Sequence, residues 1–229
     1  MELKIINAGK SKVDTKIRGL IYGNSGVGKS YLAATAPKAL ILLTEMNGQA
    51  SIIASNPKAD IIHIDSADKL AYALHQIKAG GKMWDKYDTI VIDSLTEMQR
   101  LIKDRITKGN DMRLQDWNKL TNDMMKLIRL IRNLNKNVIC LALLDVELEG
   151  EEGIRHYKPS FDGKKMSNVI SQFFNFVGML YKSQPDKDNT VDRKLILEGP
   201  SHIMCKPVGP LTGVITNPNI GDMIEKIRA

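Results

Sequence analysis

A glycine-rich segment near the amino terminus has the residue types and the spacing of a phosphate-binding loop. Residues 23–30 read "GNSGVGKS" and match the pattern G-x-x-x-x-G-K-[ST] at every fixed position. Glycine lets the backbone wrap closely around a phosphate with its N–H groups turned inward, and the lysine ammonium can reach the β- and γ-phosphates. The preceding "RGLIY" is typical of a strand, and a helical pattern follows the loop. The predicted nucleotide-binding residues are Gly23, Asn24, Ser25, Gly26, Val27, Gly28, Lys29 and Ser30, and Lys29 is also a catalytic candidate.

A second stretch supplies the carboxylate that a nucleotide-bound Mg²⁺ requires. "YDTIVIDSLTEM" places a buried-type strand, Thr89 to Ile92, directly before Asp93. We predict that Asp93 binds Mg²⁺ directly or through water and that the Ser30 hydroxyl is a second metal ligand. ATP is favoured over GTP because "NLNKNVIC", the string nearest to the Asn-Lys-x-Asp pattern of GTPases, lacks the Asp. The expected cofactors are therefore ATP and Mg²⁺.

The elements that must position these residues follow an α/β pattern. The short apolar runs "IRGLIY", "ALILL", "IIHI", "TIVI" and "VICLALL" alternate with helical segments, of which 112–135 is the clearest. Continuous apolar strands are typical of a parallel sheet that is buried on both faces. We expect a mostly parallel, doubly wound central sheet with helices on both faces, in a single domain over 1–229 with 1–16 as a lead-in. "QFFNFVGMLY" and "RKLILEG" read as further strands, and "NIGDMIEKIRA" as a closing helix.

Composition narrows the choice of partners. The chain has 33 basic and 26 acidic residues and a net charge of +7, which favours a polyanionic partner, although many basic proteins bind no nucleic acid. No apolar run is long enough for a membrane helix, so we expect no membrane partner. The N-terminus lacks the apolar region of a signal peptide, and Cys140 and Cys205 show no metal-binding spacing. A reducing cytoplasm is the expected location.

The order of these motifs resembles the short phage RecA-like ATPases of the Sak-type single-strand annealing group, which consist of little more than a RecA core. The resemblance runs from about Arg18 to the C-terminus. It rests on the phosphate loop, on Glu45 at the end of the strand in "ALILLTEMNGQAS", on "IDS" at 92–94, and on Pro159, Gly163-Lys164, "FFNFVGMLY" and Lys206.

The resemblance implies a RecA-type fold, ATP-dependent binding of single-stranded DNA, and assembly into rings or filaments. It further implies a role in annealing or recombination in the cytoplasm of a phage-infected host, with a single-strand binding protein as a further candidate partner. Glu45 would polarise the attacking water, and Lys206 would act as a finger on the γ-phosphate held by a neighbouring subunit. A solvated loop carboxylate and an ordinary surface lysine are the alternatives for these two residues. Asp145 is the only candidate γ-phosphate sensor near the end of the fifth strand.

A DNA-binding segment is expected at 147–168, which has no periodicity and reads as a mobile loop. Cations there could pair with phosphates, and Tyr157 and Phe161 could stack on unpaired bases. Acidic residues at the start of the segment oppose this interpretation, and a solvated loop is the alternative. The predicted DNA-binding residues are Arg155, Lys158, Lys164 and Lys165.

Two other functions compete with a DNA-dependent ATPase. A P-loop small-molecule kinase would need an arginine-bearing lid, for which "IRHYKPSFDGKK" is the only candidate. A nucleotide-gated replication or partition accessory protein is the other alternative. Partition ATPases carry a second lysine after the first glycine of the loop, where this chain has Asn24, and this difference counts against them.

Overall fold

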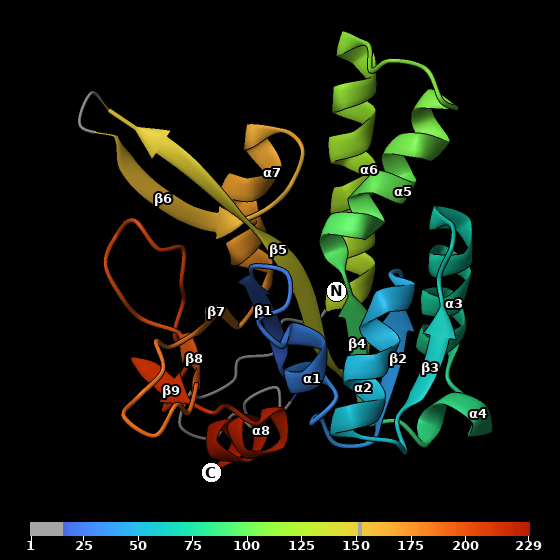
Figure 1. Cartoon of the computed structure of the whole chain (residues 1–229). Coiled ribbons are helices and arrows are strands. Elements are labelled where there is room, and N and C mark those ends of the chain that lie inside the picture. The colour runs from blue at the N-terminus through green and yellow to red at the C-terminus, as the bar shows by residue number, and fades with distance from the viewer. Residues whose placement is uncertain (1–15, 151–152) are drawn as a thin grey trace, which may run out of the picture.

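The computed structural model describes residues 16–150 and 153–229, apart from the side chains of Met46, Lys164, Lys165 and Asn168. A nine-stranded sheet with helices on both faces forms the body of the molecule (Figure 1). The strands are β1 (Arg18–Gly23), β2 (Ala39–Leu43), β3 (Asp60–His63), β4 (Thr89–Asp93), β5 (Asn137–Glu149), β6 (Ile154–Pro159), β7 (Phe176–Lys182), β8 (Arg193–Ile196) and β9 (Val214–Thr216). The helices are α1 (Lys29–Ala33), α2 (Gln49–Ser55), α3 (Ala67–Ala79), α4 (Lys82–Asp85), α5 (Leu95–Thr107), α6 (Leu114–Arg132), α7 (Lys164–Val169) and α8 (Ile220–Arg228), with 3₁₀ turns η2 (Met46–Gly48) and η3 (Ile170–Phe173).

The strand order is β3-β2-β4-β5-β1-β7-β8-β9, with β6 paired to the outer half of β5. The six strands from β3 to β7 in this order are parallel, and β8 and β9 add an antiparallel edge. β5 therefore lies between β1, which carries the phosphate loop, and β4, which ends in Asp93. The predicted fold class, a mostly parallel, doubly wound RecA-like P-loop α/β fold, is confirmed.

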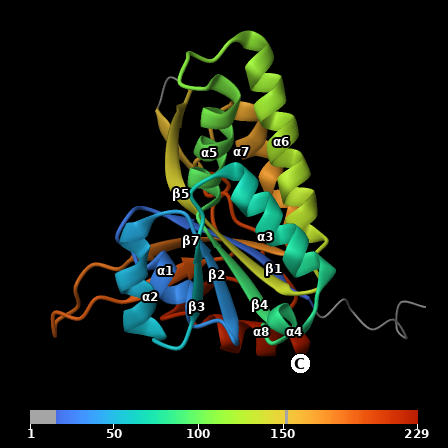
Figure 2. The ribbon, with the colours of Figure 1, turned by 90° about the vertical axis from the view of Figure 1, so that its right-hand side faces the viewer.

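Alternate side chains of the central strands pack into two separate hydrophobic cores, one on each face of the sheet. In β4, Ile90 and Ile92 face the core that α3, α5 and α6 cover, whereas Val91 faces the core that α1 and α8 cover. Figure 2 shows the sheet between these two layers. Burial on both faces explains why the strand sequences are continuous apolar runs.

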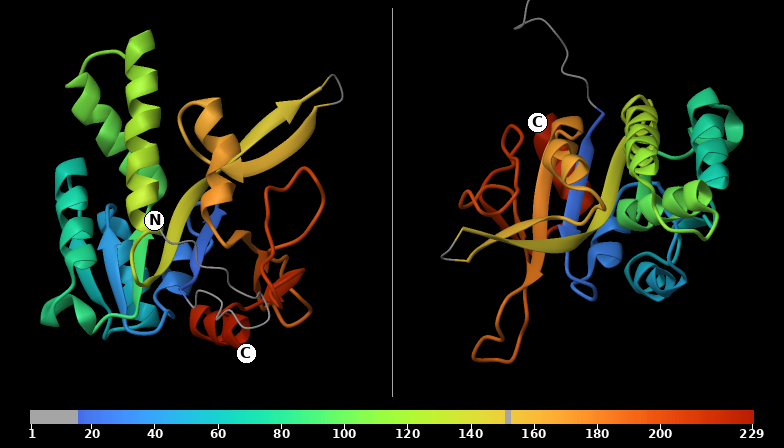
Figure 3. Two further views of the ribbon diagram at one scale, coloured as in Figure 1. Left: turned by 180° about the vertical axis from the view of Figure 1, so that it is seen from behind. Right: turned by 90° about the horizontal axis from the view of Figure 1, so that it is seen from above.

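Three elements differ from the sequence prediction. The first turns of α6 rise beyond the sheet, so Leu114, an apolar residue of the helical segment expected at 112–135, is 88% exposed. "QFFNFVGMLY" begins as η3 and becomes the strand β7 only at Phe176. The expected loop at 147–168 is largely ordered structure, because β5 continues to Glu149 and pairs antiparallel with β6. This β5–β6 hairpin projects from the body on the side away from α8 (Figures 1 and 3).

The carboxyl ends of the parallel strands share one edge of the sheet. The phosphate loop follows β1, Glu45 follows β2, and Asp93 ends β4, so the topology gathers at this edge the residues that the sequence selected. Within residues 16–150 and 153–229, no helix has the length and apolar character needed to cross a membrane.

Candidate nucleotide-binding site

The phosphate loop has the backbone conformation that its glycines permit. Gly26 and Gly28 have φ angles of 75° and 99°, in the region that disfavours side chains with a Cβ atom. Lys29 is only 8% exposed, and its ammonium donates hydrogen bonds to the carbonyls of Gly23 at 2.8 Å and Asn24 at 2.9 Å. Burial lowers the pKa of this ammonium, while the nearby charges of Asp93 and Glu45 act in the opposite direction. The loop therefore holds a buried cation that donates hydrogen bonds to two neutral carbonyls.

Asp93 provides the matching anion. It is 6% exposed, and its Oδ2 atom is buried without a hydrogen-bond donor among the described residues. Burial raises the pKa of this carboxyl, Glu45 raises it further, and Ser30 and Lys29 lower it. A carboxylate oxygen left without a donor in the interior is unusual unless a ligand or ion completes it.

The donor set fits Mg²⁺. A Cβ atom built on Gly48 would lie 3.4 Å from Asp93 Oδ2 and 3.5 Å from Ser30 Oγ, so both oxygens border one small space. Hydroxyl and carboxylate oxygens are the hard ligands that Mg²⁺ prefers, and phosphate oxygens and waters usually complete its shell. Ser30 and Asp93 are thus placed to hold the metal of a metal–nucleotide complex.

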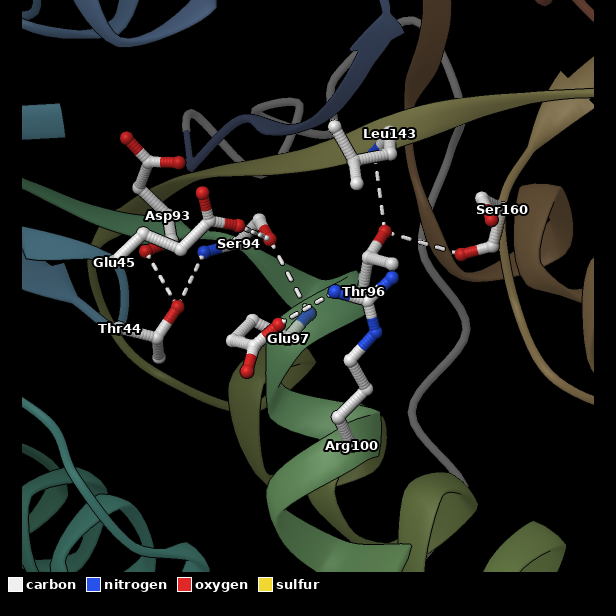
Figure 4. Close-up of polar contacts among 9 residues, drawn as sticks. All are labelled: Thr44, Glu45, Asp93, Ser94, Thr96, Glu97, Arg100, Leu143 and Ser160. Atoms are coloured by element: carbon white, nitrogen blue, oxygen red, sulfur yellow. Dashed lines mark hydrogen bonds and ion pairs between the residues drawn. The ribbon is translucent and has the colours of Figure 1, made fainter. Parts of the chain in front are cut away.

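Hydrogen bonds between the ends of β2 and β4 position Glu45. The Thr44 hydroxyl donates to the Asp93 carbonyl at 2.9 Å and accepts from the Ser94 N–H at 3.0 Å (Figure 4). The Ser94 hydroxyl lies 3.5 Å from Glu45 Oε1 and also caps α5 by accepting from the Glu97 N–H. These contacts keep the Glu45 carboxylate beside Asp93, the candidate metal ligand.

A cavity of about 500 Å³ brings the predicted groups together. Lys29, Ser30, Glu45 and Asp93 all line it. Two further lining residues, Tyr31 and Arg193, were not selected from the sequence. No sequence signal marks Arg193, because the antiparallel pairing of β8 with β7 carries it to the loop from far along the chain.

A protein-family profile described as an AAA domain matches residues 15–206. The chain belongs to this AAA domain family. Together with the phosphate loop, the candidate metal ligands and the fold, this membership makes the protein a RecA-like P-loop ATPase. No curated protein matches the chain.

Two solved structures match this AAA domain at low sequence identity. A KaiC-like protein from Pyrococcus horikoshii is 13% identical, with a TM-score of 0.48, over 88% of this chain and 89% of that one. The flagellar accessory protein FlaH from Methanocaldococcus jannaschii is 12% identical, with a TM-score of 0.45, over 90% and 89% of the two chains.

Other predicted residues of the AAA domain lie outside the cavity. Lys206 pairs through its backbone with Val177 of β7, and its ammonium donates to the Phe174 carbonyl at 2.8 Å. It is therefore not brought to the nucleotide site of its own chain, and its action on a neighbouring subunit stays a prediction. Asp145 lies on the hairpin, 3.9 Å from the Lys158 ammonium, and does not line the cavity.

The predicted DNA-binding residues have unequal environments. Lys158 is 8% exposed and is ion-paired with Glu147 as well as with Asp145, so its charge is largely neutralised within the hairpin. Arg155 is exposed at the outer part of β6. Lys164 and Lys165 begin α7, but their side chains lie outside the described part of the chain. DNA binding by this segment stays a prediction.

The first turns of α5 connect the sheet edge that carries Asp93 to the base of the hairpin. The Thr96 hydroxyl accepts from the Leu143 N–H and donates to the Ser160 carbonyl, both at 3.0 Å (Figure 4). The Gln99 amide donates to the Asp162 carbonyl at 2.9 Å and accepts from the Asp162 N–H at 2.6 Å. One short helix segment thus contacts Glu45 through Ser94 and holds the chain that leaves the hairpin.

Proposed function

We propose that this AAA domain protein hydrolyses ATP with Glu45 as the residue that activates water, and that single-stranded DNA stimulates this hydrolysis. The observation that carries the proposal is the convergence of Lys29, Ser30, Asp93 and Glu45 on one cavity. Phosphoryl transfer to water requires a cation that contacts the phosphates, ligands for the metal and a carboxylate that can accept a proton from water.

Each residue has a defined role in this reaction. Lys29 neutralises charge on the phosphate oxygens, and Ser30 and Asp93 hold the metal, which supplies Lewis-acid stabilisation when bound. Glu45 accepts a proton from the water whose oxygen attacks the γ-phosphorus, and the bond from phosphorus to the β–γ bridging oxygen breaks. Thr44 and Ser94 keep the Glu45 carboxylate in place through the hydrogen bonds at the ends of β2 and β4.

Two observations support the DNA part of the proposal. The sequence resembles RecA-like single-strand annealing proteins, and the α5 contacts link the Glu45 edge to the hairpin that carries Arg155. A shift of the Ser94 end of α5 on nucleotide binding would therefore move the base of the hairpin. A role in annealing or recombination, assembly into a ring or filament with Lys206 acting in trans, and action in a host cytoplasm belong to the same proposal.

Steady-state ATP hydrolysis with and without single-stranded DNA, at low and moderate salt, tests the function. We expect DNA to stimulate turnover at low salt, and moderate salt to weaken the effect, because phosphate contacts depend on ionic strength. Lys29→Ala removes the ammonium that contacts the phosphates, so we expect an ATP affinity at least about 100-fold weaker and no measurable turnover. Unchanged ATP affinity in Lys29→Ala would refute the phosphate-loop assignment.

A pair of charge reversals tests the DNA site. Arg155→Glu places an anion on the projecting hairpin, whereas Lys226→Glu makes the same change on α8 at the other end of the molecule. We expect only Arg155→Glu to reduce stimulation by DNA, and neither variant to alter hydrolysis without DNA. Hydrolysis that ignores DNA in the wild-type protein would instead support a nucleotide-gated accessory protein or a small-molecule kinase.

A further inference from the structure

Arg193 lies directly against the phosphate loop although it comes from the opposite end of the chain. A Cβ atom built on Gly28 would lie 2.4 Å from Arg193 Nε and 3.1 Å from its Cδ, so a larger residue at position 28 would displace this side chain. The guanidinium carbon lies 5.0 Å from the ring centroid of Tyr31, within the range of a cation–π contact. Arg193 therefore occupies the side of the loop formed by Gly28 and Tyr31.

The backbone of Arg193 is held firmly in this position. Its N–H donates to the Asn217 side-chain oxygen at 3.0 Å, and its carbonyl accepts from the Asn217 N–H at 2.6 Å. β8 also pairs with β7 on one side and with β9 on the other. The side chain thus projects toward the loop from a fixed strand.

The guanidinium of Arg193 has hydrogen-bond donors without acceptors. Arg193 Nε is buried and has no acceptor, and across residues 16–150 and 153–229 the guanidinium makes no hydrogen bond or ion pair. The carboxylate of the preceding residue, Asp192, accepts a hydrogen bond from the Asn217 amide at 2.8 Å. A buried donor without a partner is destabilising, so its retention beside a ligand cavity indicates that a ligand supplies the acceptor.

We propose that Arg193 binds the α- or β-phosphate of the nucleotide in cis, opposite Lys29. The proposal rests on the nucleotide-binding function above. In a phosphate loop of this pattern, the α- and β-phosphates lie against the backbone N–H groups at the end of the loop, where Arg193 is found. The planar guanidinium fork suits phosphate oxygens, and ATP and ADP share these two phosphates. Arg193 thereby sets the affinity for both nucleotides alike and takes no part in transfer of the γ-phosphoryl group.

The test compares Arg193→Gln with Lys194→Gln. Lys194 is the next cation on β8, and its side chain points to the other face of the strand and does not line the cavity. Dissociation constants are measured by calorimetry for Mg-ATP, Mg-ADP and inorganic tripolyphosphate, and hydrolysis is followed at saturating ATP. We expect Arg193→Gln to weaken binding of all three ligands about tenfold, with kcat changed by less than about twofold. Lys194→Gln should match the wild type, and Arg193→Lys should recover part of the affinity because it restores the charge without the fork.

Several results would overturn the proposal. Affinities in Arg193→Gln equal to those of Lys194→Gln would remove Arg193 from the site. Weaker ATP binding with normal ADP binding would place the guanidinium on the γ-phosphate, and weaker nucleotide binding with normal tripolyphosphate binding would place it on the base. A wild-type protein that binds no nucleotide would refute the proposed function itself, which is a different outcome from wild-type binding that survives Arg193→Gln unchanged. If Arg193→Gln does not fold, the same comparison is made with Arg193→Lys.

Discussion

The nucleotide site and the β5–β6 hairpin both bury charged side chains, but only the hairpin pairs its buried charge directly with groups of opposite charge. At the site, Lys29 donates to main-chain carbonyls, and buried atoms of Asp93 and Arg193 have no partner among the described residues. On the hairpin, Lys158 is paired with Glu147 and Asp145, and His156 lies 2.8 Å from Glu149.

The nucleotide site thus has buried charged groups that a ligand could pair with, whereas the charged groups of the hairpin are already paired with each other. Burial shifts the pKa of Lys29 downward and that of Asp93 upward, so each site charge is held at an energetic disadvantage. A bound metal–nucleotide complex would remove this disadvantage. Lys158 gains no comparable benefit from DNA, because a phosphate would have to displace a carboxylate already in contact. Lys158, one of the four predicted DNA-binding residues, already has two carboxylate partners within the hairpin, and DNA binding through it stays a prediction.

The largest effect that tests this contrast is expected from Glu45→Gln. The amide keeps the size of the side chain but cannot take a proton from water, so we expect kcat to fall about 10²- to 10⁴-fold. The ATP dissociation constant should stay within about twofold, because the phosphate cation and the metal ligands are retained. Single-turnover hydrolysis and equilibrium binding measure the two quantities separately.

A matched carboxylate provides the control for Glu45. Glu97 lies one turn into α5, near Ser94, and forms an ion pair with Arg100 at 2.9 Å. Glu97→Gln should leave kcat within about twofold of the wild type. Wild-type turnover in Glu45→Gln would mean that another group activates the water, and Glu45 would then have no catalytic role.

A smaller effect is expected from Asp93→Asn, with opposite signs for stability and function. Because burial raises the pKa of Asp93, the folded protein retains this proton to higher pH than the unfolded chain does, and the ionised group reduces stability as pH rises through that range. Near neutral pH and without Mg²⁺, the amide should stabilise the protein by roughly 1 kcal/mol. The same substitution should abolish the Mg²⁺-dependent part of ATP binding.

Urea unfolding at several pH values measures the stability effect of Asp93→Asn. Asp88, just before the other end of β4, is exposed and paired with Lys38 at 3.2 Å, so Asp88→Asn is the control. The stability gain of Asp93→Asn should diminish as pH falls, whereas Asp88→Asn should change stability by less than about 0.5 kcal/mol. A loss of stability in Asp93→Asn at neutral pH would contradict the view that the site stores unfavourable charge.

How far the sequence could predict the molecule depends on how local each feature is. The phosphate loop occupies consecutive residues, and Asp93 directly follows its apolar strand, so a short pattern contains the geometry that places them. Glu45 was selected through the resemblance to RecA-like ATPases, and it lies at the same edge as Asp93 because β2 and β4 are parallel neighbours. Arg193 was out of reach because only the β7–β8 pairing brings it to Gly28. The hairpin was mistaken for a loop because its apolar alternation, Val146-Glu147-Leu148-Glu149, is short, and because Val146 and Leu148 are exposed and so form no continuous apolar run of the kind seen in the buried strands.

The smallest effect, and the one that most directly tests the structural role of the hairpin charges, is expected from Glu147→Gln. The change removes the nearer carboxylate partner of the buried Lys158 ammonium and leaves Asp145 at 3.9 Å, so we expect a loss of about 1 kcal/mol in unfolding free energy. Glu149→Gln makes the same substitution two residues along the same strand, where the carboxylate is 72% exposed, and should have less than half of that effect. ATP affinity should be unaffected by both variants, because neither residue lines the nucleotide cavity. Equal stability losses would show that burial of Lys158 does not strengthen the stabilising effect of its ion pair. An altered ATP affinity in Glu147→Gln would show that the hairpin and the nucleotide site are electrostatically coupled.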